Sequence, residues 1–396
     1  MTVSRGRDFL ALPGPTTVPH EVLQAMQRPA VDIYGEELTA VTDSCLDDLR
    51  RVFRTEQGRT YIYIANGHGA WEAALSNVLS RGDKVLVLES GRFAVGWGEM
   101  AEPLGIEVEV LEAEPQRAAS PGALERRLRA DNAGEIKAIL VVQVDTASGV
   151  ANDIPALGAA IEASGHGALF MVDVIASLGS MPFEMDDWSV DVAVAGAQKG
   201  LMMTPGLSFI AASEKALAAH ADAGLRTRYW DWTVREGELH YMKYCGTPPV
   251  HLLFGLRKSL DMLFEEGLEA AFRRHELLAG ATQAAVGRWS DAGTLSFNVP
   301  ERAERSPTVT TILLEEPHLG RLLDWVGKVC NVSLGIGLGP LLSGHAFRIA
   351  HMGHVNAPMM LGTLGAIETG LAALDIPHGK GGVSAAIDHL GSRLKA

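Results

Sequence analysis

A lysine and an aspartate occupy similar positions, each after an apolar segment of the chain. Ala168–Val172 leads directly into Asp173, and Val190–Ala195 leads through Gly196-Ala197-Gln198 to Lys199. Short, almost wholly apolar runs are typical of strands that are buried on both faces of a sheet. Ligands of open α/β sheets bind at the carboxyl ends of the strands, so the two side chains are predicted to share a site. There the lysine amine could form a Schiff base with a carbonyl group, beside a carboxylate.

Two further polar turns follow apolar runs and are expected at the same edge of the sheet. Tyr61–Ala65 leads to Asn66-Gly67-His68-Gly69, which opens a helix, and Ala138–Val144 leads to Asp145-Thr146-Ala147-Ser148-Gly149. The first amides of a helix and its positive dipole end can bind phosphate. Each feature alone has an ordinary explanation, because such residues also cap helices, form turns or face solvent. Together they supply the lysine, the carboxylate and the phosphate cradle that pyridoxal phosphate requires.

The elements that would position these residues alternate between short apolar strands and helical segments. This alternation predicts an α/β fold with a mostly parallel sheet flanked by helices. Helices such as Ala70–Leu79 and Ile154–Ala163 separate several of the strands. The predicted strands are Tyr61–Ala65, Val85–Leu88, Val108–Leu111, Ala138–Val144, Ala168–Val174, Val190–Ala195 and Leu207–Ala211.

Three regions are predicted along the chain. Residues 1–20, rich in proline and glycine, are expected to form an irregular arm. Residues 21–265 are expected to form a large cofactor-binding domain, and residues 266–396 a smaller C-terminal α+β domain. The boundary follows from a change of pattern after the long helix predicted at His251–Glu266, which a second helix at Gly267–Trp289 continues. The strands predicted beyond it are Thr308–Leu314, Val332–Leu334 and Phe347–Ala350.

The composition is that of a folded, acidic protein. The 396 residues are 47% hydrophobic and 21% charged, which is enough apolar material for a core and too little charge for disorder. The formal net charge of −14 argues against nucleic acid or an anionic membrane as a partner. Cys45, Cys245 and Cys330 are expected to be free buried thiols in a reducing compartment. Neither a signal peptide at Met1–Leu10 nor a membrane span is predicted, so a cytoplasmic location is expected.

The polar turns lie in motifs that resemble a known family, the fold-type I pyridoxal-phosphate aminotransferases of class V, in their alanine–glyoxylate and serine–glyoxylate branch. The resemblance covers nearly the whole chain and is most specific around Asp173 and Lys199. Its motifs are Leu12-Pro13-Gly14-Pro15-Thr16, Gly67-His68-Gly69-Ala70-Trp71, Val172-Asp173-Val174-Ile175-Ala176-Ser177, Gly196-Ala197-Gln198-Lys199-Gly200, Tyr244-Cys245-Gly246-Thr247-Pro248-Pro249 and Phe347-Arg348-Ile349-Ala350-His351.

The resemblance implies a role for each matching residue. Lys199 would carry the cofactor as a Schiff base, and Asp173 would pair with its pyridine nitrogen. The other residues implied at the cofactor are Asn66, Gly67, His68 and Gln198 at its phosphate, Phe93 and Thr146 at its ring, and Tyr244 and Thr247 from a neighbouring subunit. Those implied at the substrate are Arg348, whose planar fork suits a carboxylate, with Gly14 and Tyr34. Residues from a neighbour imply a homodimer with shared active sites.

Two positions depart from the family pattern. Phe93 stands where many relatives have a tryptophan on the cofactor ring, and phenylalanine can stack but offers no N–H group. The segment Val31–Leu38 replaces a His-Arg-Ser-Pro stretch that is common in serine–glyoxylate relatives and lies near the substrate entrance. The second difference leaves the amino donor open.

The resulting hypothesis is a ping-pong transamination that moves the amino group of a small amino acid, such as serine or alanine, to glyoxylate. One alternative is a pyruvate-accepting transaminase with a less common amine donor, and another is a lyase of the same fold. A lyase of the cysteine desulfurase kind needs a mobile cysteine, whereas Cys330 lies in an apolar run. A silent binding protein is a third alternative, opposed by the presence of Lys199, Asp173 and Arg348 together. No metal site is expected, because His351 and His354 lack a third ligand nearby.

Overall fold

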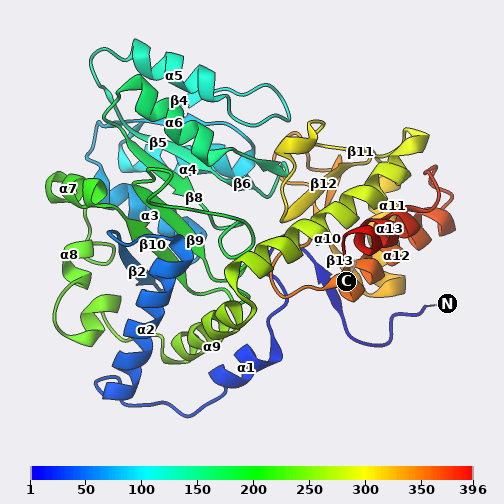
Figure 1. Cartoon of the computed structure of the whole chain (residues 1–396), viewed down its shortest axis with the longest axis horizontal. Coiled ribbons are helices and arrows are strands. Elements are labelled where there is room, and N and C mark those ends of the chain that lie inside the picture. Colours follow the sequence, from blue (N-terminus) through cyan, green and yellow to red (C-terminus); the bar gives the residue numbers. More distant parts are fainter. Residues whose placement is uncertain (1, 395–396) are drawn as a thin grey trace.

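The computed structural model describes residues 2–394 as two α/β units, with one long helix, α10 (Leu268–Trp289), that runs from the larger to the smaller (Figure 1). The larger unit contains a seven-stranded sheet in the order β2-β10-β9-β8-β5-β3-β4. All neighbouring strands are parallel except at β10, which runs antiparallel to β2 and β9. Its strands are β2 (Arg59–Tyr63), β3 (Lys84–Leu88), β4 (Glu107–Leu111), β5 (Ile136–Val142), β8 (Leu169–Asp173), β9 (Val192–Gly196) and β10 (Ser208–Ala212). The predicted fold class, a mostly parallel sheet flanked by helices, is confirmed.

The central strands read as continuous apolar runs because helices cover both faces of the sheet. In β5, Ile139 and Val141 pack into the core on one face, whereas Ala138 and Leu140 pack into the core on the other. Alternate residues of a strand point to opposite faces, so both sets must be apolar. The helices that contribute to the first core are α1 (His20–Met26), α2 (Glu36–Phe53), α5 (Pro121–Ala130), α6 (Ile154–Ser164) and α9 (Val250–Glu266). Those that contribute to the second are α3 (Gly67–Val78), α4 (Arg92–Ala101), α7 (Glu214–Asp222) and α8 (Trp232–Arg235).

The smaller unit is a five-stranded sheet in the order β1-β13-β14-β12-β11, covered by helices. Its strands are β1 (Phe9–Ala11), β11 (Ser296–Phe297), β12 (Val309–Leu313), β13 (Val332–Ile336) and β14 (Ala346–Ala350), and its helices are α10, α11 (His318–Trp325), α12 (Ala357–Ala373) and α13 (Gly382–Arg393). The N-terminal segment is therefore not irregular throughout, because β1 pairs in parallel with β13. Three residues are too few to give a periodic signal in the sequence.

Helix α10 belongs to both hydrophobic cores. Ala271, in its first turn, packs into a core of the large unit, while Leu278 and the residues after it pack into the core of the small unit. The chain crosses between the units a second time near its beginning, where it runs from β1 to α1 (Figure 1). The two units are thus joined by two segments that are far apart in the sequence.

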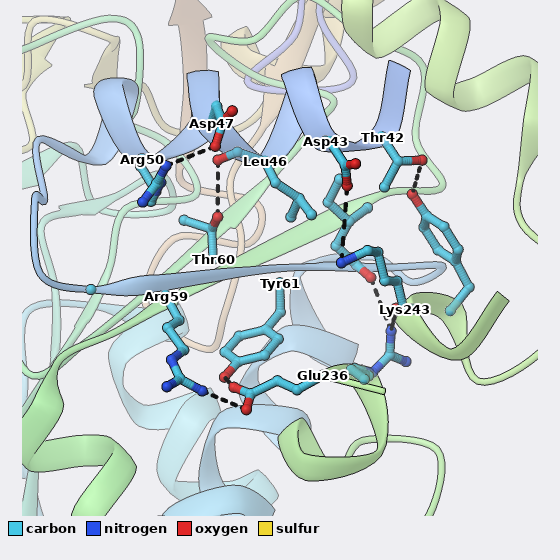
Figure 2. A pocket seen from close by; sticks show the side chains of 14 residues that line it. Thr42, Asp43, Leu46, Asp47, Arg50, Arg59, Thr60, Tyr61, Glu236 and Lys243 are labelled. Atoms are coloured by element: carbon cyan, nitrogen blue, oxygen red, sulfur yellow. Dashed lines mark hydrogen bonds and ion pairs between the residues drawn. The ribbon is translucent and has the colours of Figure 1, made fainter. Parts of the chain in front are cut away.

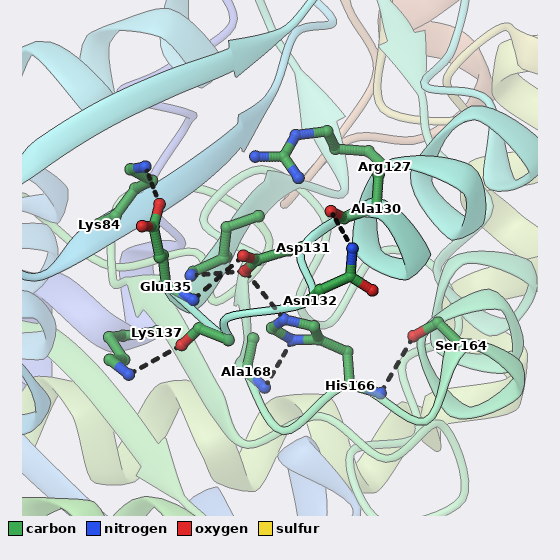
Figure 3. Close-up of polar contacts among 12 residues, drawn as sticks. Lys84, Arg127, Ala130, Asp131, Asn132, Glu135, Lys137, Ser164, His166 and Ala168 are labelled. Carbon is green, nitrogen blue, oxygen red and sulfur yellow. Dashed lines mark hydrogen bonds and ion pairs between the residues drawn. The ribbon is translucent and has the colours of Figure 1, made fainter.

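The amino ends of two central strands are fixed by a buried polar pair (Figure 3). His166 Nε2 lies 3.1 Å from Asp131 Oδ2, and the Asp131 carboxylate also accepts the backbone N–H of Ile136 at 2.9 Å. His166 Nδ1 accepts the N–H of Ala168 at 3.1 Å. Asp131 precedes β5 and His166 precedes β8, so this pair aligns the two strands whose opposite, carboxyl ends lead to Asp145 and Asp173.

Three smaller expectations can be compared with the structure. Cys45 is buried, but Cys245 and Cys330 are partly exposed, so the prediction of three buried thiols is wrong for two of them. Cys330 ends a single π-helical turn (Val326–Cys330), where an apolar sequence does not imply full burial. Among residues 2–394, no helix combines the length and the apolar character that crossing a membrane requires.

Candidate active site

Lys199 follows β9 and is enclosed by the N-terminal arm. Its side chain is buried, and its Nζ donates a hydrogen bond to the carbonyl oxygen of Pro13. A Cβ at position 14 would lie 2.6 Å from Nζ, so only glycine leaves room for the lysine there. The arm is held in place because Thr16 Oγ1 donates to the carbonyl oxygen of Lys199 at 3.0 Å. Gly14 is thus next to the lysine.

The surroundings of Lys199 favour its neutral form. Burial and, to a lesser extent, the positive charge of Arg348 lower the pKa of the ammonium group to about 8, against the opposing effect of Asp173. A buried amine with a depressed pKa is a better nucleophile and base near neutral pH than a solvent-exposed one. The position therefore suits a lysine that attacks a carbonyl carbon.

Asp173 ends β8, and its carboxylate is buried and hydrogen-bonded on both oxygens. Oδ2 accepts from Trp71 Nε1 at 2.7 Å, and Oδ1 accepts from the backbone N–H of Ile175 at 2.6 Å. Burial nevertheless raises the pKa of Asp173 to about 7, against the lowering effects of these two bonds and of Lys199. A cation placed against this carboxylate would restore its charge, which is what a protonated ring nitrogen would provide.

The turn before α3 offers an open helix N-terminus. The Asn66 side chain caps the helix by accepting the N–H of Gly69 at 3.2 Å, while the side chains of Asn66 and His68 are exposed. A Cβ on Gly67 would collide with the side chain of Ile175, so the turn packs against the residues that follow Asp173. Within residues 2–394, the buried Oε1 of Gln198 has no hydrogen-bond partner. These groups form a polar cradle beside the lysine and the aspartate.

Aromatic rings line the space next to Asp173. The ring centroids of His68 and Trp71 are 4.7 Å apart, and that of Phe93 lies 6.4 Å from Trp71 and 6.5 Å from His68. Trp71 also stacks on Trp97 at 5.9 Å, which anchors the cluster in the core. Phe93 is only half-buried, and an aromatic ring that is partly exposed can stack on a planar ligand.

Arg348 reaches the same site from the small unit. It lies on β14 with 6% of its surface exposed, and it donates from Nε to the carbonyl oxygen of Ile336 and from Nη1 to that of Thr146, both at 2.7 Å. Burial lowers the pKa of the guanidinium to about 10, while the negative charge of Asp145 opposes the shift. These two bonds fix the plane of the guanidinium and leave Nη2 available for a carboxylate.

Three residues implied by the resemblance lie elsewhere in the chain. Tyr244 is buried and its hydroxyl is 2.9 Å from Thr42 Oγ1, beside a pocket of about 330 Å³ formed by α2, β2 and residues 235–244 (Figure 2). Thr247 is exposed nearby, and Tyr34 is 73% exposed with its ring edge-on to Tyr241 at 6.5 Å. The structure does not bring these three side chains to Lys199 of the same chain.

Sequence reasoning assigned no role to three contributors to this site. These are the carbonyl oxygen of Pro13, the indole of Trp71 and the carboxylate of Asp145, which accepts backbone N–H groups of α4 and of its own turn. Asp145 lies in one of the polar turns that the sequence highlighted, and Trp71 lies in a motif of the family resemblance, on α3, so both positions carried a signal. Their partners are distant in the sequence, so no local pattern could identify the contacts.

The residues present fit pyridoxal phosphate. The site combines a buried lysine of depressed pKa with a buried carboxylate of raised pKa and a glycine-containing helix N-terminus. It also holds the Gln198 Oε1 atom, which has no partner in the part of the chain that the structure describes. These match the cofactor's aldehyde, ring nitrogen and phosphate in chemical type.

Comparison with known proteins also indicates a pyridoxal-phosphate enzyme, of the aminotransferase kind. Residues 9–355 match the family model of the class-V aminotransferases. The chain is 40% identical to a serine–glyoxylate aminotransferase of Methylorubrum extorquens, over 97% of this chain and 96% of that protein. It is 35% identical to an L-aspartate–glyoxylate aminotransferase of Paracoccus denitrificans, over 96% and 95% of the two chains. The crystal structure of pyridoxamine–pyruvate aminotransferase from Mesorhizobium loti superposes with a TM-score of 0.89 at 26% identity, covering 99% of this chain and 100% of that one.

The protonation of Lys199 gives a test of the site in the cofactor-free protein. Because burial depresses its pKa to about 8, the neutral, reactive fraction should rise with pH through about 8, well below the ordinary value of 10.5. Competitive labelling with trace acetic anhydride from about pH 6 to about pH 11, read by mass spectrometry, would measure this fraction. The exposed Lys137 provides the internal reference.

The variant Arg348→Gln removes a neighbouring positive charge, so the labelling curve of Lys199 should move to higher pH. A wild-type curve centred near 10.5 would show that Lys199 is solvated and would contradict the description of this site.

Proposed function

The chain belongs to the class-V aminotransferase family and uses pyridoxal phosphate, and from this we propose that it moves the amino group of a small amino acid to glyoxylate, forming glycine. The observation that supports the proposal is that Lys199 is near enough to Asp173 on the large sheet and to Arg348 on the small sheet for both charges to shift its pKa. Because the chain is a transaminase, the alternatives of a lyase and a silent binding protein are not retained.

We assign the cofactor contacts according to chemistry. Lys199 would hold the aldehyde carbon, Asp173 the ring nitrogen, and Phe93 and Thr146 the ring. The turn Asn66–His68 and Gln198 would hold the phosphate. When bound, the cofactor acts as an electron sink that stabilises the negative charge left when the substrate loses its Cα proton.

The remaining work falls to side chains of this chain. Arg348 binds the α-carboxylate that the amino acid and the 2-oxo acid share, through the guanidinium edge that Ile336 and Thr146 leave free. Asp173, in its charged form, keeps the ring nitrogen protonated. The amine of Lys199, once released, carries the proton to and from the substrate's Cα, and the arm at Pro13 and Gly14 excludes water from it.

The relatives agree less on the amino donor than on the acceptor. The relatives named above act on serine or aspartate with glyoxylate, and the structural neighbour acts on pyridoxamine with pyruvate. Serine or alanine is our proposed donor, with pyruvate and a less common amine as the alternative pair. The segment Val31–Leu38, where this chain differs from the serine–glyoxylate pattern, holds the exposed Tyr34 and is the natural place to look for the difference.

We also propose a homodimer that shares its active sites. Asn66 and His68 of the phosphate turn are exposed in the single chain, and so are several apolar side chains, some of them in the segments that contain Tyr34 and Thr247. They are Tyr34, Ile64, Tyr229, Leu239 and Tyr241. A surface of this kind is typical of protein interfaces, and a second subunit that covers it would bring the exposed Thr247 towards the neighbour's phosphate. Tyr244 does not present its hydroxyl in the same way, because it is buried in its own subunit with that hydroxyl on Thr42.

Removal of Lys199 tests the catalytic assignment. Lys199→Ala should lose transamination by at least about a thousandfold, since it removes both the covalent anchor and the proton carrier. Borohydride reduction followed by peptide mapping should place the cofactor on the Lys199 peptide of the wild type and on no peptide of the variant. Lys137→Ala, which changes an exposed lysine, is the matched control and should behave as wild type. Retained turnover in Lys199→Ala would disprove the assignment.

Steady-state kinetics with a panel of substrates test the reaction. Serine, alanine and aspartate, each paired with glyoxylate and with pyruvate, should give parallel double-reciprocal lines for the productive pairs, because the amino group leaves the first substrate before the second binds. Glyoxylate should give glycine as the product. Intersecting lines would contradict the ping-pong order, and turnover with pyruvate alone would favour the alternative pair.

Mixed dimers test the shared site. Thr247→Val should lower the affinity for the cofactor by about tenfold through loss of one hydrogen bond to phosphate. In a mixed dimer of Thr247→Val with Lys199→Ala, one site keeps its own Lys199 and receives Thr247 from the other subunit, so its affinity should return to the wild-type value. A monomer in sedimentation experiments, or a mixed dimer without recovery, would contradict the proposal.

A further inference from the structure

Asp145 is a buried carboxylate, and among residues 2–394 every hydrogen bond that its oxygens accept comes from a backbone amide. It ends β6 (Val144–Asp145), a two-residue strand that comes after β5 and pairs with β7 (Val150–Ala151). It is fully buried and accepts N–H groups from two separate segments of the large unit. Oδ2 accepts from Phe93 at 2.7 Å and Ala94 at 3.1 Å, and Oδ1 accepts from Ala147 at 2.9 Å and Ser148 at 3.3 Å. Each oxygen thus holds one segment.

The first segment is the start of α4, which carries Phe93. The residue before this helix, Gly91, has no side chain to cap it, unlike Asn66 before α3. Asp145 supplies the cap from more than fifty positions along the chain, with its negative charge at the positive end of the helix dipole. A Cβ on Gly91 would lie 2.5 Å from Asp145 Cγ, so the helix start and the carboxylate are in close contact.

The second segment is the turn 145–149, which is also hydrogen-bonded to the small unit. Four successive carbonyl oxygens of this turn accept hydrogen bonds from residues of the small unit. They are those of Thr146 from Arg348 Nη1 (2.7 Å), Ala147 from Thr311 Oγ1 (3.2 Å), Ser148 from Asn298 Nδ2 (2.7 Å) and Gly149 from the N–H of Ser306 (3.0 Å). The carbonyl oxygen of Thr146 therefore helps to set the position of Arg348. On the other side of the same turn, the Asp145 carboxylate holds the amides of Ala147 and Ser148.

We propose that Asp145 is a positioning residue that sets Phe93 and Arg348 relative to each other, by fixing the start of α4 and the turn 145–149 to one carboxylate. One of these side chains is assigned to the cofactor and the other to the substrate carboxylate, so the kinetic consequence rests on the proposed function. The geometric consequence does not, because it concerns contacts within the chain itself.

The charge and the two acceptor oxygens are both needed. Asparagine has the same shape, but its amide group would place two hydrogens against N–H donors that now meet an oxygen. One of the two segments would then lose its anchor. The negative charge of Asp145 also favours the charged form of Arg348 at a buried position, an effect that asparagine lacks.

The test is Asp145→Asn, compared with Asp191→Asn as the matched control. Asp191 is also buried and accepts the N–H of Phe170 at 2.8 Å, Ser213 Oγ at 3.0 Å and Lys215 Nζ at 2.9 Å, but it precedes β9 at the opposite edge of the sheet. Asp145→Asn should raise KM for both the amino acid and the 2-oxo acid by about tenfold to a hundredfold, with a smaller change in kcat. Asp191→Asn should lower thermal stability and leave both KM values unchanged.

Hydrogen–deuterium exchange of the cofactor-free proteins gives a readout without turnover. Amides of residues 92–95 and 146–149 should exchange faster in Asp145→Asn than in wild type, and at the wild-type rate in Asp191→Asn. If Asp145→Asn lowers stability only, with unchanged exchange at these amides and unchanged KM values, the positioning role is wrong. A wild-type chain inactive with every donor would refute the proposed function, and the exchange comparison would still decide the role of Asp145.

A second variant, Thr311→Val, tests the same positioning of Arg348 if Asp145→Asn does not fold. Thr311→Val removes the bond from the small unit to the carbonyl oxygen of Ala147 while conserving the side-chain shape. It should raise KM for both substrates in the same direction and by less than Asp145→Asn, with cofactor affinity unchanged. Wild-type KM values in a folded Thr311→Val protein would contradict the idea that this turn positions Arg348.

Discussion

The burial of four charged groups in one place is the constraint on which the site depends. Asp145, Asp173, Lys199 and Arg348 are all buried, two negative and two positive. Moving an ion out of water costs several kcal/mol even after the protein relaxes, so such groups remain only where hydrogen bonds and opposite charges compensate. The pKa shifts reflect this cost: burial is the largest cause for each of the four, and it favours the neutral form of each. An amine close to its neutral form is what the proposed chemistry needs.

The compensation comes largely from the backbone rather than from ion pairs. Asp145 is satisfied by four amides and Arg348 by two carbonyl oxygens, while Lys199 donates to the carbonyl oxygen of Pro13. Backbone partners cannot leave without moving the chain, so the charged groups and the segments around them are fixed together. The arm, the turn 145–149 and strand β14 are held against one another at the junction of the two units. A site at this junction is complete only when both units are folded.

The sequence predicted the large sheet and its key side chains for physical reasons that hold locally. Strands such as β5 and β8 are buried on both faces, which produces continuous apolar runs, and their carboxyl ends gather at one edge of the sheet. Asp173 and Lys199 could therefore be placed together from their positions after such runs. Arg348 needed the family resemblance, because an arginine in a short strand has many ordinary uses. Asp145 as the cap of α4 and the path of the arm through β1 could not be predicted, since both depend on contacts between segments that are distant in the sequence.

The buried charged groups and the exposed surroundings of the site would have different tasks in the proposed reaction, and the difference concerns which amino donor is accepted. In the proposed reaction, the buried groups would bind features that every amino acid and 2-oxo acid share, namely the carboxylate at Arg348 and the α-carbon at Lys199. In these roles, none of the four buried groups would contact the substrate's side chain. In the proposed dimer, discrimination between donors would instead arise where exposed residues such as Tyr34 are brought to the substrate entrance of a partner subunit. A change of a few residues there can alter the donor without disturbing the buried charges, because a methylene or hydroxyl group in a pocket changes binding by only about 1–3 kcal/mol. Relatives named for serine and for aspartate, both at 35–40% identity to this chain, are consistent with that division.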